Sequence, residues 1–159
     1  HVKLGPGGIR EIEFIAQAHQ LIRGGRDSSL QVRPTLDVLA RLAERGLLDR
    51  AAVNELAGAY VFLRQVEHRL QYLDDAQTHL LPSGDDDRAR IAASMGCADW
   101  SAFRAALDAH RDDVSRHFGG VFARANGEGA VAATNCEDLG AVWLGSCDAE
   151  AGRAILAAR

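Results

Sequence analysis

A glycine-rich turn that leads directly into an amphipathic helix is the stretch that decides how this chain folds. It runs from Lys3 to Gln17 and reads K-L-G-P-G-G-I-R-E-I-E-F-I-A-Q. Its glycines can adopt positive φ angles, and its proline fixes one φ angle. After the turn, a stripe of mainly apolar residues recurs every three or four positions, the period of an amphipathic helix. The residues of this stripe are Ile9, Ile12, Ile15, Ala16, His19 and Ile22.

A polar stripe follows another face of the same helix. Arg10, Glu13, Gln17 and Gln20 stand three or four positions apart, a spacing that places their side chains on one side of a helix. Ordered polarity of this kind beside a glycine turn is typical of a helix that faces a ligand. The backbone N–H groups of the turn could hold a phosphate at the helix N-terminus, with Lys3 adding positive charge. The alternative is a plain turn into the helix.

Composition places the chain among soluble globular domains. Of its 159 residues, 47% are hydrophobic and 25% are charged, and the formal net charge is −4. This acidic balance argues against a nucleic-acid partner, because such binders usually carry a basic stripe. No apolar run approaches the ~20 residues that span a bilayer, so we expect no membrane partner. Three widely spaced cysteines match neither a zinc site nor a disulfide framework, which favours a reducing cytoplasm.

The hydrophobic pattern is helical almost throughout and predicts an all-α fold. We expect an antiparallel bundle of about five helices over residues 1–125, with spans near 8–23, 34–45, 50–76, 86–95 and 100–125. Only Val2-Lys3-Leu4 could be the end of a strand. Residues 126–159 are predicted to be a flexible linker toward a next domain, with a possible short helix near 148–158. Because the chain begins with His1, we interpret it as a fragment of a longer protein.

Apolar residues at helical spacing predict which side of each later helix is buried. They are Leu36, Leu39, Leu42 and Ala43, then Val53, Leu56, Ala57, Tyr60, Leu63, Val66, Leu70 and Leu73, and finally Phe103, Leu107, Val114, Phe118 and Phe122.

A second polar stripe lies on the predicted helix 50–76. Arg64, Glu67, His68 and Gln71 share one side of it, at spacings of three, four and seven. One interpretation is a network of ion pairs and amides between helices. The other is the wall of a pocket that offers arginine to a phosphate and amides or carboxylates to a ribose or base. Spacing alone favours the packing network, since such pairs are common on helices.

Other polar groups have ordinary explanations. Residues Asp85–Asp87 stand where negative charge favours a helix N-terminus, which is a better account than a metal site. Glu11 and Glu13 are two positions apart and point about 200° away from each other on a helix, so they cannot share an ion. His110 and His117 are expected to be solvated.

Four motifs in order carry a resemblance to a known family. They are K-L-G-P-G-G-I-R-E-I-E-F-I-A-Q, A-Y-V-F-L-R-Q-V-E-H-R-L-Q, D-A-Q-T-H-L-L-P and R-A-R-I-A-A-S-M-G, within residues 2 to about 122. Together they resemble the glutamine synthetase adenylyltransferase/deadenylylase family, in which one chain joins two nucleotidyltransferase domains, each followed by a helical bundle. G-G-I-R-E-I-E-F and Q-T-H-L-L-P are similar to the N-terminal, deadenylylating half. The other half, which adds AMP from ATP, typically has a different residue in place of Arg10.

The resemblance implies which parts of the reaction belong elsewhere. The deadenylylating half removes AMP from a tyrosine of glutamine synthetase by phosphorolysis, and the intact enzyme uses Mg²⁺ with nucleotide or phosphate. Its metal-binding Asp-x-Asp carboxylates would lie upstream of His1, so we expect no catalytic residue, metal ligand, bound cofactor or activity in this chain alone. By motif position, the residues that would line the cleft are Lys3, Gly7, Gly8, Arg10, Glu11, Glu13 and Gln17, supported by Arg64, Glu67, His68 and Gln71.

We therefore interpret the chain as the helical domain that completes the cleft of a deadenylylating core. The implied partners are that upstream core, glutamine synthetase and a PII-type regulatory protein. The alternative is a non-catalytic interaction module that relays signals of the regulator or docks glutamine synthetase. A uridylyltransferase-type relative that shares the bundle would need a different upstream core.

Overall fold

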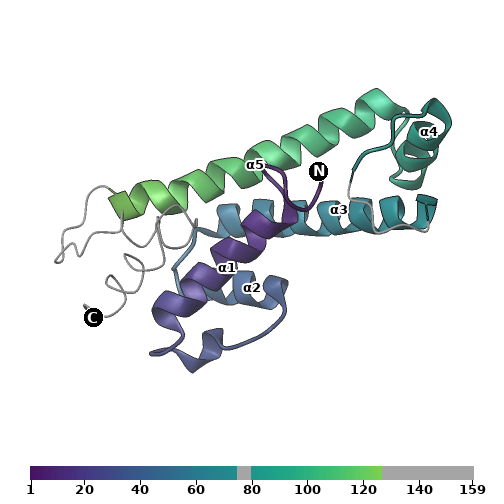
Figure 1. Cartoon of the computed structure of the whole chain (residues 1–159). Helices are drawn as coiled ribbons and strands as arrows, with labels where there is room; N and C mark the ends of the chain where they lie inside the picture. Colours follow the sequence, from purple (N-terminus) through teal and green to yellow (C-terminus); the bar gives the residue numbers. More distant parts are fainter. Residues whose placement is uncertain (75–79, 127–159) are drawn as a thin grey trace, which may run out of the picture. The chain divides into compact units, whose positions relative to one another are not determined.

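The computed structural model describes residues 1–74 and 80–126, and within these ranges it contains α-helices, one short 3-10 helix and no strand. The all-α prediction is confirmed. Residues 1–119 form one compact unit, whose boundary falls inside the last helix. The predicted linker and its short helix lie outside the described residues. The elements, drawn in Figure 1, are α1 (Ile9–Arg23), η1 (Ser28–Leu30), α2 (Thr35–Glu44), α3 (Arg50–Asp74), α4 (Asp85–Ser94) and α5 (Trp100–Asn126).

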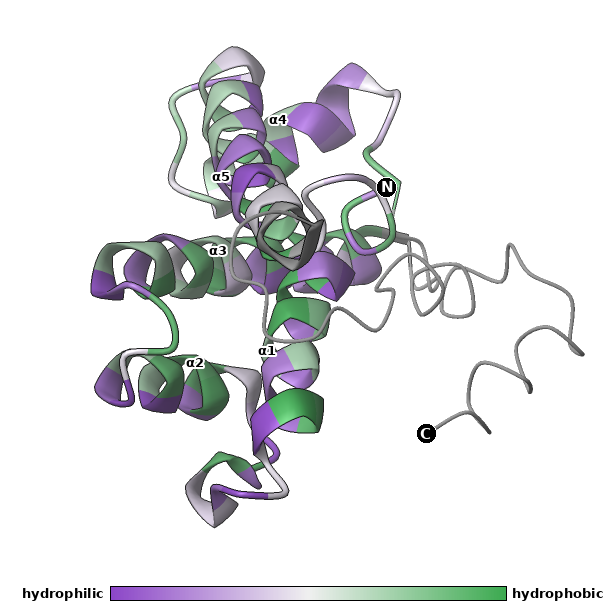
Figure 2. Ribbon diagram, turned by 90° about the vertical axis from the view of Figure 1, so that its left-hand side faces the viewer, coloured by the Kyte–Doolittle hydropathy of each residue, from purple (hydrophilic) through white to green (hydrophobic). Residues whose placement is uncertain are grey.

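Helix boundaries agree with the predicted spans to within a residue or two, because the expected capping residues are in place. Asp99 accepts a hydrogen bond from the N–H of Ala102 at 2.8 Å, so its side chain caps the start of α5. Gly46 and Gly96, which follow α2 and α4, have φ angles of +65° and +72°. The three aspartates occupy the first turn of α4, the strongly hydrophilic turn in Figure 2.

Helices α3 and α5 run antiparallel, as the order of their contacts shows. Phe62 on α3 stacks on Phe103 at a centroid distance of 6.3 Å. Glu55, earlier on α3, meets Arg116 and His117, which come later on α5. Because the residue numbers rise along α3 as those of the contacted residues on α5 fall, the two helices run in opposite directions. Both helices also carry buried apolar residues, among them Leu63 on α3 and Leu107 on α5.

The buried residues follow the predicted stripes with two corrections. Leu36 was expected inside but is 37% exposed, and Val38 is buried in its place at 1%. Ile22 is 73% exposed, although it continues the stripe of Ile9 and Ile15. The helical period predicts which way a side chain points around its own axis, but not how far along the helix a neighbour extends. Of the described apolar residues, the fully buried ones include Ile12, Leu39, Leu42, Leu56, Leu63, Leu70, Phe103, Leu107 and Val114.

The predicted strand end at residues 2–4 is a turn. Val2 is 1% exposed, and its carbonyl accepts a hydrogen bond from the N–H of Ile9 at 3.4 Å. The carbonyl of Lys3 accepts one from the N–H of Arg10 at 3.2 Å. These bonds fold the N-terminal segment back over the first turn of α1, which gives its backbone groups partners without a sheet.

His19 predicts how the stability of the bundle depends on pH. Burial on α1, together with the nearby charge of Arg23, lowers the pKa of His19 from its ordinary value. The unfolded chain therefore binds a proton more readily, and stability decreases as the pH falls through the unfolded pKa of about 6.5. We expect His19→Gln to flatten this acid limb in denaturant titrations between pH 7.5 and 5.5. A slope that His19→Gln leaves unchanged would contradict the prediction.

Candidate functional site

The glycine turn that opens the chain packs against α5. The guanidinium of Arg111 donates two hydrogen bonds to the carbonyl of Pro6, from Nε at 2.9 Å and from Nη2 at 2.8 Å. Gly7 has a φ of +68°, and a Cβ built on it would lie 2.3 Å from the backbone oxygen of Arg111. Only glycine fits both the φ angle and the close approach. The sequence pattern did not predict this contact, which joins residues 105 positions apart.

The N–H groups of the turn already have acceptors within the protein. Glu11 accepts from the N–H of Gly7 at 3.0 Å through Oε2, so it caps the turn from inside α1. The next three N–H groups bond to backbone carbonyls. A phosphate cradle made of these groups is therefore not what the turn offers, and the plain-turn alternative describes it. These three bonds run from Gly8 to Gly5 at 3.0 Å, from Ile9 to Val2 at 3.4 Å and from Arg10 to Lys3 at 3.2 Å.

Glu67 is the buried charged side chain of the described residues. It is 2% exposed, and its two carboxylate oxygens meet different cations. Oε1 lies 3.8 Å from Nζ of Lys3, and Oε2 accepts a hydrogen bond from Nη1 of Arg64. The side chains of Lys3 and Arg64 are 40% and 38% exposed, so each cation has one side on the carboxylate and another toward solvent. The segment before α1 and the polar stripe of α3 therefore meet at Glu67.

The other candidate residues differ in their exposure. Arg10 and Gln17 are exposed on α1, and Glu13 is half-buried. Within the ranges that the structure describes, Arg10 forms no ion pair. On α3, His68 is exposed and Gln71 is half-buried. Lys3, which precedes α1 and is not a member of the first stripe, is thus the residue that reaches the α3 stripe, at Glu67.

Gln20, the last member of the first stripe, has a structural contact. Its Nε2 donates to the carbonyls of Leu30 at 2.6 Å and Val32 at 2.8 Å, so it ties η1 and the following loop to α1. The helical spacing of the stripe gave no signal that separates Gln20 from the stripe residues that were predicted to face a ligand.

A second charged cluster joins α3 to α5 and corrects the prediction for two histidines. His117 is 18% exposed, and its Nε2 lies 2.6 Å from Oε2 of Glu55. Arg116 donates to the same oxygen at 3.0 Å. Hydrogen bonds from His117 and then from Arg116 lower the pKa of Glu55. His110 is also half-buried, and its ring lies tilted against that of Phe62 at a centroid distance of 4.6 Å.

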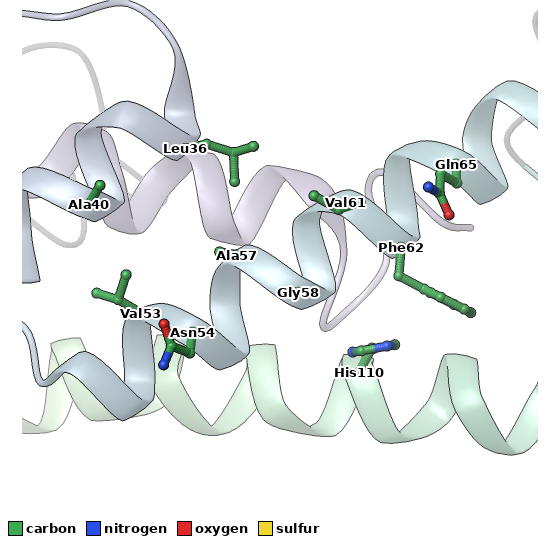
Figure 3. A pocket seen from close by; sticks show the side chains of 10 residues that line it. All are labelled: Leu36, Ala40, Val53, Asn54, Ala57, Gly58, Val61, Phe62, Gln65 and His110. Carbon is green, nitrogen blue, oxygen red and sulfur yellow. The ribbon is translucent and has the colours of Figure 1, made fainter.

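An open apolar groove lies along α2 and α3, with His110 of α5 at one side (Figure 3). Its volume is about 700 Å³. Leu36 and Val61 stand at its wall and are 37% and 43% exposed. Gly58, in the middle of α3, has no atom within 4 Å of a built Cβ. In the sequence, the position of Gly58 in the middle of a predicted helix is the feature that could have indicated this surface. The lining residues are Leu36, Ala40, Val53, Asn54, Ala57, Gly58, Val61, Phe62, Gln65 and His110.

The described residues hold no metal centre. Nowhere in residues 1–74 and 80–126 do three His, Cys, Asp or Glu side chains gather closely enough to bind an ion. Each helix of the described ranges is too short or too polar to cross a membrane.

Comparisons with known proteins give one family model and a set of curated relatives. The family model described as GlnD PII-uridylyltransferase matches residues 1–122. Several curated relatives are named bifunctional glutamine synthetase adenylyltransferase/adenylyl-removing enzyme. The one from Aromatoleum aromaticum is 54% identical over 98% of this chain and 16% of its own length. The one from Chromobacterium violaceum is 62% identical over 77% of this chain and 14% of its own length. The one from Nitrosococcus oceani is 51% identical over 99% of this chain, which thus spans about a sixth of these relatives.

Proposed function

The chain belongs to the family of bifunctional glutamine synthetase adenylyltransferases, and from that premise we propose that it is the helical domain that follows the deadenylylating nucleotidyltransferase core. In this role it closes one side of the cleft in which AMP is removed from a tyrosine of glutamine synthetase. The uridylyltransferase alternative is supported by the description of the family model, whereas the relatives at 51–62% identity carry the adenylyltransferase name.

The exposed guanidinium of Arg10 is the observation that carries the proposal. Arg10 stands in the first turn of α1, directly after a turn that Arg111 and Glu11 hold in place. Its backbone is fixed by the hydrogen bond to the carbonyl of Lys3, while its side chain has no ion-pair partner in the described ranges. A fixed backbone with a solvated arginine head is well suited to meet a phosphate that another domain presents.

Phosphorolysis needs positive charge around the reacting phosphate more than it needs covalent help from the protein. An oxygen of inorganic phosphate attacks the phosphorus of the AMP group, and the tyrosine oxygen leaves and takes up a proton. Arg10 would neutralise charge on the phosphate oxygens, and the half-exposed cations of Lys3 and Arg64 would add to the positive field. Mg²⁺ would supply further neutralisation, and we assign it to the upstream core because the described residues offer no ligand cluster.

The proposal predicts that Arg10→Ala in the intact enzyme lowers phosphorolysis of adenylylated glutamine synthetase by about 10²-fold, since one lost charge-stabilising donor typically costs that much. Arg33→Ala, which removes another exposed arginine of this chain, is the matched control and should leave the rate unchanged. Adenylylation by the other half should be normal in both variants. If Arg10→Ala deadenylylates as fast as the unmodified enzyme, the bundle does not line the cleft.

The apolar groove favours a second candidate function, in which the bundle docks glutamine synthetase without touching the nucleotide. Leu36 and Val61 expose apolar surface there, and Gly58 permits a close approach by another chain. The same kinetic experiment separates the two functions when it includes Val61→Asp. A docking module predicts a raised KM for adenylylated glutamine synthetase in Val61→Asp and a normal rate in Arg10→Ala. The cleft function predicts a normal KM in Val61→Asp and a lowered rate in Arg10→Ala.

A further inference from the structure

We infer that Glu67 is a positioning residue, whose buried carboxylate sets the placement of Arg10 through Lys3. The inference rests on the proposed function, because it explains how the cleft side of the bundle is held in register with the reacting phosphate. Glu67 itself would touch neither the substrate nor the reacting atoms.

The burial of Glu67 requires an explanation beyond stability. A carboxylate that is 2% exposed loses most of its hydration, and its two ion pairs offset that loss. Apolar residues of similar volume often stabilise a fold as well as or better than a buried ion pair. The ion pairs of Glu67 therefore have more value as fixed geometry than as a source of folding free energy. One negative and two positive charges leave the trio with a net charge of +1, which suits an anionic substrate.

A short path of contacts leads from Glu67 to Arg10. Oε1 of Glu67 lies 3.8 Å from Nζ of Lys3, and the carbonyl of Lys3 accepts the N–H of Arg10 at 3.2 Å. Glu67 therefore fixes the side chain of the residue whose backbone holds the start of α1. Without the carboxylate, Lys3 keeps its backbone hydrogen bond to Arg10 but loses its ion pair with α3.

Arg111 restrains the same segment from the opposite helix. It holds the carbonyl of Pro6 with two hydrogen bonds from α5, while Glu67 holds Lys3 from α3. The segment from Lys3 to Gly8 is thus held at Lys3 and at Pro6, and Arg10 follows four positions after Pro6. A displacement of about 1 Å in a positioning group can cost as much as 10²-fold in rate, so restraint at these two points matters for a cleft residue.

The test compares Glu67→Gln with Glu55→Gln in the intact enzyme. Both changes remove one carboxylate charge from α3 at nearly the same volume, but Glu55 pairs with Arg116 and His117 instead of with Lys3. We expect Glu67→Gln to lower kcat for phosphorolysis about tenfold with little change in the KM for adenylylated glutamine synthetase. Backbone amides of residues 5–10 should exchange hydrogen faster in this variant. Glu55→Gln should leave the kcat and this exchange unchanged.

Lys3→Met provides a second variant in case Glu67→Gln does not fold. The side chain of Lys3 is 40% exposed, so its loss breaks the same contact from the solvent side. It should reproduce both the faster exchange and the lower kcat. Because Lys3 is itself placed near the phosphate, a lower kcat without faster exchange would overturn the inference.

Three further outcomes separate the inference from the proposed function. If Arg10→Ala lowers phosphorolysis while Glu67→Gln does not, Glu67 is not a positioning residue and the cleft function stands. If Glu67→Gln leaves the exchange of residues 5–10 unchanged, the inference also fails. If hydrogen exchange of residues 5–10 rises in Glu67→Gln, but neither Glu67→Gln nor Arg10→Ala changes the rate of phosphorolysis, both the inference and the cleft function are overturned.

Discussion

Replacing Gly7 with alanine is expected to destabilise the bundle by about 3 kcal/mol or more, as judged from typical costs of strain and overpacking. Two effects combine at this position. A φ of +68° is costly for a residue with a side chain, and the new Cβ would lie 2.3 Å from the backbone oxygen of Arg111. Backbone atoms cannot move aside as a flexible side chain can, so the turn must separate from α5. Urea denaturation of the 159-residue chain, followed by circular dichroism, measures the loss.

Gly46→Ala is the matched control for this experiment. Gly46 has nearly the same φ, +65°, but a Cβ built on it meets nothing within 4 Å. It should cost only the backbone strain, about 1–2 kcal/mol. The difference between the two variants then measures the close approach of the turn to α5. Equal losses in Gly7→Ala and Gly46→Ala would show that the packing against Arg111 contributes nothing to stability.

Replacing Phe103 with alanine is expected to cost about 3–5 kcal/mol, the usual range for a large aromatic side chain in a core. Phe103 is 0% exposed and contacts two other rings. Its centroid lies 6.3 Å from that of Phe62 on α3 and 5.0 Å from that of Trp100. The variant leaves a cavity between α3 and α5 and removes both ring contacts, so the midpoint of thermal unfolding should fall as well.

Leu21→Ala serves as the control for the loss of apolar volume. Leu21 lies on α1 and is 72% exposed, so its truncation removes little buried surface. Alanine is also at least as good a helix former as leucine. The free energy of unfolding should change by less than about 0.5 kcal/mol. A loss in Leu21→Ala comparable with that in Phe103→Ala would mean that α1 packs against something at its exposed end.

Much of the fold follows from local patterns in the sequence. The helices begin and end where glycine, proline and aspartate predict, because capping depends on residues within one turn of each end. The buried sides of α3 and α5 follow from apolar spacing, since a long helix with a continuous partner repeats one direction every 3.6 residues. The errors at Leu36 and Ile22 have the opposite origin. Both residues continue an apolar stripe at helical spacing, but within the described residues both side chains stay exposed.

The candidate site depended on contacts that spacing does not predict. The polar stripe of α3 was visible, yet nothing in it distinguished the buried Glu67 from the exposed His68. Glu11 was predicted to line the cleft, and the structure adds its bond to the N–H of Gly7. Whether the predicted cleft residues meet the substrate stays a prediction, which the Arg10 variant tests.

The sequence by itself determined the helical elements and their caps, because these depend on residues that are close together in the chain, and four motifs spread over the chain indicated the family. Only the tertiary structure decided which polar groups are buried and which helices hold the glycine turn. Arg111 meets Pro6 across 105 positions, and Lys3 meets Glu67 from another helix. Such contacts arise when packed helices bring distant residues together, and a helical period describes only one helix at a time. The turn that opens the chain is therefore held in place by α3 and α5.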